Sequence, residues 1–132
     1  DFHRVSALFH DMPIRRMSKL TQRLMQSIDY ERVAQQRIDN YNTLKAALGG
    51  KELHYGEVPM IFPYKSAEGQ QLRQRFIAKK VFVAKYWPNV DEWTEEDTVE
   101  RWMANHVLPL PIDQRYDKED MNRLINTIKN YE

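Results

Sequence analysis

The stretch His106–Tyr131, HVLPLPIDQRYDKEDMNRLINTIKNY, decides how the rest of the chain must fold. It begins with a short apolar run, His106–Leu110. Proline in and after this run lacks the N–H group of a sheet ladder, which predicts a short or edge strand. A loop, Ile112–Tyr116, follows. Asp117 then predicts the N-cap of a helix, because acidic side chains follow it in the first turn, where unpaired N–H groups favour negative charge.

The helix after Asp117 carries one apolar stripe at helical spacing, formed by Met121, Leu124, Ile125 and Ile128. A helix of this length is not stable alone, because nucleation costs more than a few turns return. A sheet or another helix must therefore cover the stripe.

Upstream, two more segments predict strands, and two predict helices. Val58–Tyr64 is apolar and bracketed by proline, and Val81–Ala84 is β-branched and aromatic. One helix is expected from Ser66, its N-cap, to Lys80, and another over Thr94–Ala104. The order of elements predicts an α+β fold, with a small three-stranded, mostly antiparallel sheet covered by helices.

The N-terminal part predicts a long helical arm. Residues 14–50 are expected to be helical, with a break at Ser27–Asp29, where Asp29 starts a new helix, and an end at Gly49 and Gly50. Before them, residues 1–13 predict a segment with a short helix that Pro13 stops. We interpret residues 51–132 as the α+β small domain, and the whole chain as one structural domain.

Composition excludes several classes of protein. The chain has 132 residues, 42% hydrophobic and 30% charged, as in ordinary globular proteins. Its net charge of +1 gives no general case for nucleic-acid binding. The absence of cysteine excludes disulfides and thiol catalysis. No apolar run approaches the roughly 20 residues that span a bilayer. We expect a cytoplasmic protein, without membrane or nucleic-acid partners, and interpret the start at Asp1 as that of a processed product or a piece of a longer protein.

The sequence contains few motifs for chemistry. It has no glycine-rich phosphate loop, and its histidines lack the spacing of a metal site, so no metal is expected. Acidic pairs at helix starts are explained by capping. A basic cluster precedes the break in the arm. It is open to three interpretations: a solvated face, a contact between domains, or a phosphate or nucleic-acid contact. Its members are Arg15, Arg16, Lys19 and Arg23.

Two loops at strand ends are candidates for a site, because binding residues concentrate on such loops. Tyr86 and Trp87 are neighbouring aromatics before Pro88, and Trp87 is either a substrate platform or a packing residue. Arg115 could bind a carboxylate or phosphate with two parallel hydrogen bonds. Alternatively, it pairs locally with Asp113 or Asp117.

Three segments occur in a characteristic order. The first comprises Met17–Leu20, Ile28–Glu31 and Arg37–Tyr41, with Leu44 and Leu48. The second comprises Leu72, Arg73 and Phe76–Val83, followed by Tyr86–Pro88. The third is Leu108–Tyr116 with Glu119–Met121. This set resembles the C-terminal small domain of fold-type I pyridoxal-phosphate (PLP) enzymes, and most closely the DegT/DnrJ-type nucleotide-sugar aminotransferases, over residues 14–131. Two positions depart from the family pattern: Ile38 replaces a second arginine, and Lys80 stands where glycine is common.

The resemblance implies an enzyme that moves an amino group between glutamate, or another donor, and a keto sugar nucleotide in polysaccharide biosynthesis. In that family the cofactor lysine, the aspartate on the pyridinium nitrogen and the phosphate-binding residues lie in a larger upstream domain. They supply the covalent link and keep the ring an electron sink. We therefore expect no catalytic or cofactor-binding residue in this chain. Tyr86, Trp87 and Arg115 would line the mouth of the active site in an intact homodimer.

Two functions of different class follow as hypotheses. The first is the small, lid domain of an aminotransferase-like protein, which is inactive without its large domain. The second is a stand-alone or fused interaction domain that keeps the fold without the chemistry. The first predicts exposed apolar surface around Ala7–Met12 and Leu20–Ile28, which would find a partner.

Overall fold

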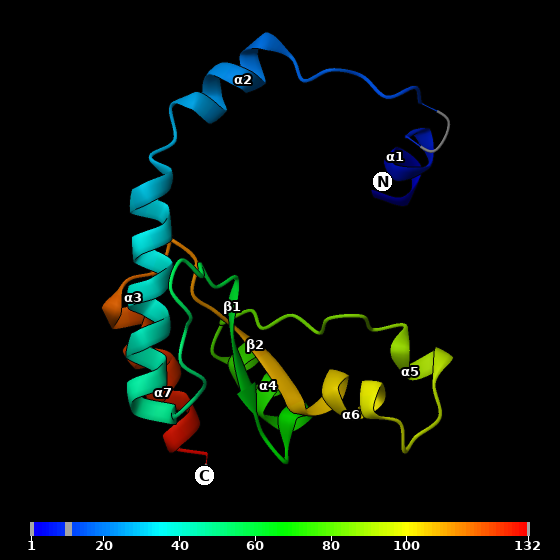
Figure 1. Cartoon of the computed structure of the whole chain (residues 1–132). Coiled ribbons are helices and arrows are strands. Elements are labelled where there is room, and N and C mark those ends of the chain that lie inside the picture. The colour runs from blue at the N-terminus through cyan, green and yellow to red at the C-terminus, as the bar shows by residue number, and fades with distance from the viewer. Residues whose placement is uncertain (1, 10–11, 132) are drawn as a thin grey trace.

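The fold is α+β, as predicted. The computed structural model describes residues 2–9 and 12–131. Figure 1 shows a body of helices around a small sheet, from which an N-terminal arm, here the described residues before Tyr30, curves away; residues 30–48 of the expected arm instead pack in the body. The elements, in chain order, are α1 (Phe2–Leu8), α2 (Lys19–Gln26), α3 (Tyr30–Leu48), β1 (Ile61–Lys65), α4 (Gly69–Ala78), α5 (Val90–Trp93), α6 (Val99–His106), β2 (Val107–Pro111) and α7 (Lys118–Lys129).

The sheet consists of β1 and β2 in antiparallel pairing, and proline sets its hydrogen-bond pattern. Pro63 lies opposite Pro109, and neither has an N–H group, so this pair is not hydrogen-bonded. Because bonded and non-bonded pairs alternate, the bonded pairs are Phe62 with Leu110 and Tyr64 with Leu108. Continuing this pattern past the strand ends, the N–H of Ser66 donates to the carbonyl of His106 at 2.9 Å.

The predicted third strand is wrong. Val81–Ala84 runs past the sheet without pairing, and the described residues form a sheet of two strands. Some positions of each strand would direct their backbone N–H away from the partner strand, and proline occupies several of them: Pro63 on β1, and Pro109 and Pro111 on β2. Proline thus removes one of the three outward N–H groups of β1 but two of the three of β2, so a further strand would find few donors on the β2 edge, and a β-branched sequence alone does not recruit this segment. Val83 is nevertheless buried, and it joins the core from an extended loop.

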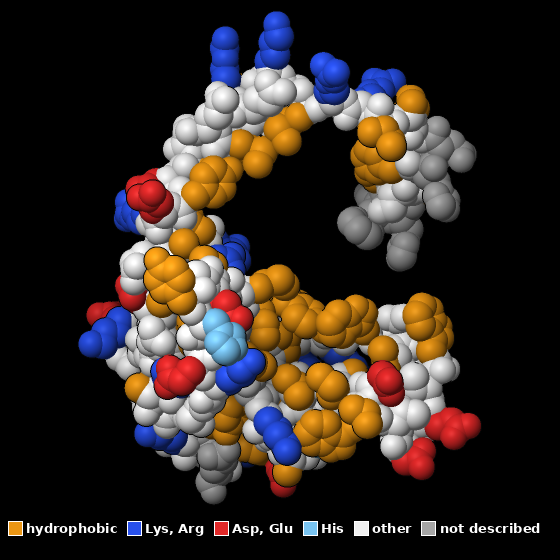
Figure 2. Space-filling view, viewed as in Figure 1, with side chains coloured by type: hydrophobic (Ala, Val, Ile, Leu, Met, Phe, Trp, Pro, Cys, Tyr) orange, Lys and Arg blue, Asp and Glu red, His pale blue; other side chains and the backbone are white. Residues whose placement is uncertain are grey.

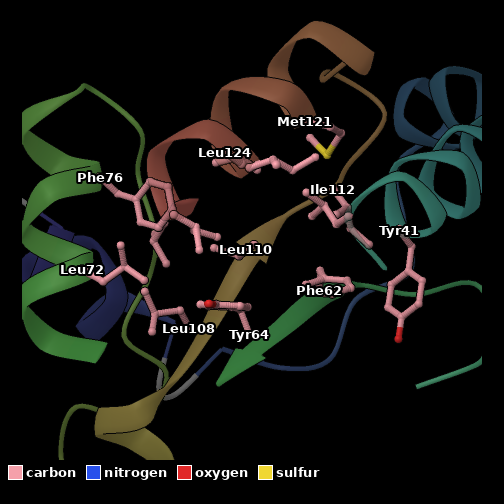
Figure 3. Close-up of a cluster of buried hydrophobic side chains, with 14 residues drawn as sticks. Tyr41, Phe62, Tyr64, Leu72, Phe76, Leu108, Leu110, Ile112, Met121 and Leu124 are labelled. Atoms are coloured by element: carbon pink, nitrogen blue, oxygen red, sulfur yellow. The ribbon is translucent and has the colours of Figure 1, made fainter. Parts of the chain in front are cut away.

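The core lies on one face of the sheet. Figure 3 shows side chains of α3, α4 and α7 pointing toward the face formed by Phe62, Tyr64, Leu108 and Leu110. The helices contribute Tyr41, Leu44, Leu72, Phe76, Met121, Leu124, Ile125 and Ile128. The apolar stripe predicted for the last helix is therefore confirmed as its buried side, and α7 packs against α3 as well as the sheet.

Local capping follows the sequence closely. Asp117 accepts hydrogen bonds from the N–H groups of Glu119 and Asp120, and the Asp120 side chain accepts one from the N–H of Asp117, which completes a capping box. Asp29 caps α3 by accepting from the N–H of Arg32 at 2.9 Å, and Gly49 ends that helix at a φ of 75°. The break at Ser27–Asp29 is confirmed.

Three helix boundaries differ from prediction. Residues 12–18 are not helical, because Ser18 is the N-cap of α2 and accepts from the N–H of Thr21. The helix expected from Ser66 begins at Gly69. The helix expected over Thr94–Ala104 is also shorter: Thr98 precedes its start at Val99, residues 94–98 form a turn, and the short α5 lies before them.

The arm carries apolar side chains that no described part of the chain covers. None of the residues of α2 is buried, and Leu20 and Leu24 are 68% and 59% exposed. Leu8, Phe9 and Met12 are exposed as well, so the predicted exposure of both regions is confirmed outside the undescribed residues 10 and 11. Figure 2 shows hydrophobic side chains along the inner side of the arm and lysines and arginines on its outer side.

None of the helices in the described ranges is both long enough and apolar enough to cross a lipid bilayer.

Candidate functional site

The face of the sheet opposite the core forms the floor of an apolar hollow of about 760 Å³. We call this hollow the sheet groove. Its floor is Ile61, Val107 and Pro109, the residues whose side chains alternate away from the core. Its walls come from the segment before β1, the loop after Val83, the start of α5 and helix α6: Met60, Tyr86, Trp87, Val90, Glu100, Met103 and Ala104.

A polar network holds the loop that carries Tyr86 and Trp87. The Lys85 ammonium forms an ion pair with Asp91 and donates to the Asn105 side-chain oxygen at 2.8 Å. Asn105 donates in turn to Asp91 at 3.3 Å and accepts from Gln70 of α4 at 2.9 Å. The hydrogen bond from Lys85 is the main reason that the pKa of Asp91 lies below its ordinary range. The network ties both ends of the aromatic loop to α4 and α6.

Arg73 lies beside this network. It is a buried arginine of α4, and its Nε and Nη2 atoms have no hydrogen-bond partner among the described residues. Burial lowers the pKa of its guanidinium, while the negative charge of Asp91 acts in the opposite direction. Asp91 therefore offsets two positive charges, those of Lys85 and Arg73, beneath the loop.

A second, smaller hollow of about 270 Å³ adjoins the sheet groove. The two share Met60, Ile61, Tyr86 and Pro109 as lining residues. The smaller hollow is more polar, since its further lining includes Arg37, Asp113 and Arg115. The structure thus brings Tyr86 between the two hollows, with Trp87 at the larger and Arg115 at the smaller.

Arg115 pairs locally, which is the alternative interpretation of that residue. Its Nε and Nη2 donate to the two carboxylate oxygens of Asp113 at 2.8 and 2.9 Å, and its backbone N–H donates to the same side chain at 3.0 Å. These bonds hold the pKa of Asp113 below its ordinary value and raise that of Arg115. The Arg115 side chain is exposed, so an anionic ligand could reach it but would compete with Asp113 for its guanidinium.

Two side chains of α3 position these loops, and the sequence did not identify either as a site residue. Asn40 is buried, and its amide donates to the carbonyls of Ile112 and Tyr116 at 3.2 and 3.0 Å. Arg37 donates to the carbonyls of Pro59 and Met60, both at 3.3 Å. Asn40 therefore fixes the loop after β2 to α3, and Arg37 fixes the segment before β1 to the same helix. Both lie in the Arg37–Tyr41 segment, but their partners are far away in the sequence.

The lining chemistry does not fit PLP. That cofactor needs an amine for its covalent link, and no lysine lines either hollow among the described residues. Among its lining side chains, the sheet groove has one charged at neutral pH, Glu100, which would repel a phosphate. No step of cofactor chemistry is therefore assigned to these residues. The described ranges also contain no group of three or more side chains able to hold a metal ion.

Comparisons with protein-family models, with curated proteins and with solved structures found no match to this chain.

Proposed function

We propose that this chain is the small domain of a PLP-dependent sugar aminotransferase-like protein, which packs against a large cofactor-binding domain and is inactive by itself. The observation that carries the proposal is the uncovered apolar side of the arm. The three ordered segments of the sequence support the choice of family.

The N-terminal end of the arm is the surface for the large domain. Val5, Leu8, Phe9, Met12 and Ile14 are all exposed, and Ile14 is fully so. Monomeric proteins rarely leave such a run of large apolar side chains in water, and a run of this kind marks an interaction surface. In the family that the sequence resembles, the large domain precedes this region of the chain, so these residues are its nearest neighbours.

The two hollows would then face the substrate. Tyr86 and Trp87 supply flat apolar surface for a sugar nucleotide, and Arg115 supplies a cation for its phosphates or for the donor's carboxylate. Asp113 holds that arginine in place until an anion replaces it. The role is one of covering and orienting, and the covalent chemistry belongs to the large domain.

The proposal is tested by expressing the chain with and without the coding sequence that precedes Asp1. PLP is added to both products, the bound form is fixed with borohydride, and the modified lysine is mapped by mass spectrometry. We expect one stoichiometric adduct, on a lysine upstream of Asp1, in the longer product. Amide exchange at residues 5–14 should be slower in the longer product than in the isolated chain.

Two results would overturn the proposal. A stoichiometric adduct on a lysine of residues 1–132 would give this chain a cofactor site of its own. A longer product without any cofactor lysine, in which residues 5–14 are still protected, would favour the interaction domain that keeps the fold without the chemistry.

A further inference from the structure

Two uncovered apolar surfaces of this chain complement each other. One is the stripe of α2, and the other is the sheet groove. We propose that the sheet groove of one copy binds α2 of a second copy, and that the exchange is reciprocal, so that the chain forms a symmetric dimer. The proposal concerns the chain by itself, without a large domain, and does not rest on the aminotransferase role; in this dimer, α2 occupies the sheet groove in place of the substrate.

The stripe of α2 is built as the apolar side of a docking helix. Leu20, Leu24 and Ile28 recur at four-residue spacing, with Met17 and Met25 beside them. Each is between 42% and 68% exposed, and Ser18 caps the helix without tertiary support. A helix of eight residues is not stable in water by itself, so its ordered form requires a covering partner.

The charged side chains around this stripe are all basic. Residues 12–28 contain four basic side chains and no acidic one. Lys19 and Arg23, four residues apart, lie along one flank of α2, and Arg15 and Arg16 precede the helix. Figure 2 shows lysines and arginines projecting from the arm on the side away from its apolar stripe.

Acidic side chains gather in residues 91–100 at one end of the sheet groove, a segment that we call the acidic rim; Glu100 is its member that lines the groove. Residues 91–100, which comprise most of α5, the turn after it and the start of α6, contain six acidic side chains and no basic one. Asp91 is engaged by Lys85. The other five are exposed and lie outside the ion pairs of the described residues: Glu92, Glu95, Glu96, Asp97 and Glu100. Figure 2 shows acidic side chains gathered at this end of the body.

The sheet groove beside this acidic segment offers apolar side chains to a docked helix. Met60, Trp87 and Met103 line it and are 67%, 70% and 53% exposed. Methionine side chains are flexible, so they adapt to the ridges of a docked helix. A basic amphipathic helix is the ligand that an apolar groove with an acidic rim selects, and this chain contains such a helix.

The shape of the chain favours exchange between two copies. Figure 1 shows that α3 carries α2 beyond the sheet, so that the arm and the body enclose a concave space without meeting. No residue of α2 is buried by the described part of its own chain. Two concave molecules related by a two-fold axis can each insert the arm into the other, which makes two identical contacts and closes the assembly.

The apolar contact is tested first. Sedimentation of the wild-type chain over a range of concentrations should show a monomer–dimer equilibrium. Leu20→Ser/Leu24→Ser should raise the dimer Kd by about a hundredfold or more, because buried leucines carry the contact. Gln22→Ser, on the opposite side of α2, is the matched control and should leave Kd unchanged. Both leucines are exposed in the monomer, so the unfolding midpoint of the isolated monomer should not fall.

The charges supply the more specific test. Lys19→Glu/Arg23→Glu reverses the charge of the arm at two positions, and Glu95→Lys/Glu96→Lys reverses the charge of the acidic rim at two positions. Each double variant should weaken its own homodimer by about tenfold or more. An equimolar mixture should restore wild-type affinity, because each arm in the heterodimer then meets a rim of opposite charge. Lys118→Glu, exposed at the start of α7, is the control for a general change of charge.

Three outcomes would overturn the inference. The first is a wild-type chain that stays monomeric at every concentration. The second is a dimer whose Kd is unchanged by the leucine substitutions. The third is a mixture of the two reversed variants that dimerises no better than either alone. These measurements use no cofactor, so their result is separate from that of the PLP experiment.

Discussion

Pro63 and Pro109 lie directly opposite each other at the centre of the sheet. Both lack N–H groups, so both must occupy positions whose donors would point away from the partner strand. This pairing fits the register, which places Phe62 and Tyr64 on the core face with Leu108 and Leu110, and it removes one outward N–H group from each edge of the sheet. The register also turns Ile61, Val107 and Pro109 to the opposite face, where they form the floor of the sheet groove.

Gly69 is expected to tolerate no side chain. A Cβ atom at this position would lie 2.3 Å from the carbonyl oxygen of Asn105 and 3.0 Å from the Cα of His106, and both are backbone atoms. Gly69→Ala must therefore push α4 away from α6, which should lower the free energy of unfolding by about 3 kcal/mol. Urea unfolding measures the loss. Gln71→Ala, exposed on the same helix, is the control, and equal stability of the two variants would contradict the contact.

Lys80 has a φ of 60°, in the left-handed region, at the end of α4. The N–H of Val81 donates to the carbonyl of Phe76, and that of Lys80 to Ile77, as in a helix end that usually has glycine. The left-handed conformation costs a non-glycine residue about 1–2 kcal/mol, while glycine costs about 0.5–1 kcal/mol in unfolded-state entropy. Lys80→Gly should therefore stabilise the chain by about 0.5 kcal/mol in urea unfolding. Lys80→Ala, which keeps Cβ and removes the charge, should show no gain, and an equal gain in both variants would refute this explanation.

Asn40 is expected to be the most sensitive polar residue of α3. Asn40→Leu would leave the buried carbonyl of Ile112 without its side-chain donor and lose the bond to Tyr116, at a cost of about 2 kcal/mol or more. Amide exchange over residues 112–116 should become faster in the same variant, because the loop loses its anchor. Asn42→Leu, an exposed position on the same helix, is the control. Unchanged exchange in the loop would show that Asn40 does not anchor it.

The Asp113–Arg115 pair predicts a specific loss of stability in acid. The pKa of Asp113 is held below its ordinary value of 3.8, chiefly by the hydrogen bond from Arg115. The unfolded chain therefore binds a proton at Asp113 more readily than the folded chain. The contribution is complete well above pH 3.8 and is lost as pH falls through the lower, folded pKa. In Asp113→Asn, the free energy of unfolding should fall less steeply with pH from about pH 5 downward.

The matched control for this pH series is Asp97→Asn. Asp97 is exposed and lies outside the ion pairs of the described residues, so its substitution should leave the slope with pH near that of the wild type. Arg115→Gln should reproduce the flatter slope of Asp113→Asn, because it removes the main donor to that carboxylate. A wild-type slope in Arg115→Gln would assign the effect to another group.

Much of the local structure could be predicted from the sequence. The capping box at Asp117, the break before Asp29 and the helix end at Gly49 each depend on hydrogen bonds or dihedral angles within a few residues. The apolar stripe of α7 likewise follows from helical periodicity. By contrast, the predicted start of α6 at Thr94 is too early. Thr94 and Thr98 are both plausible N-caps, and the helix begins after Thr98.

The site was predictable only in part. The sequence identified Tyr86, Trp87 and Arg115 as residues of two loops, and the structure shows that these loops flank adjoining hollows. The sequence could not identify Asn40 or Lys85 as the residues that position them. Their partners, such as Ile112 and Asn105, are separated from them by 72 and 20 positions.

By itself, the sequence of this protein determined where its helices are capped, which residues share a helical stripe, and that its fold is α+β. Only the tertiary structure decided that the sheet has two strands, that Val81–Ala84 is left out of it, and that its second face forms the floor of the sheet groove. The physical reason is the separation along the sequence of the residues that make contact. Caps and stripes arise from contacts a few residues apart, whereas the ladder between residues 61–65 and 107–111 exists only when distant segments meet.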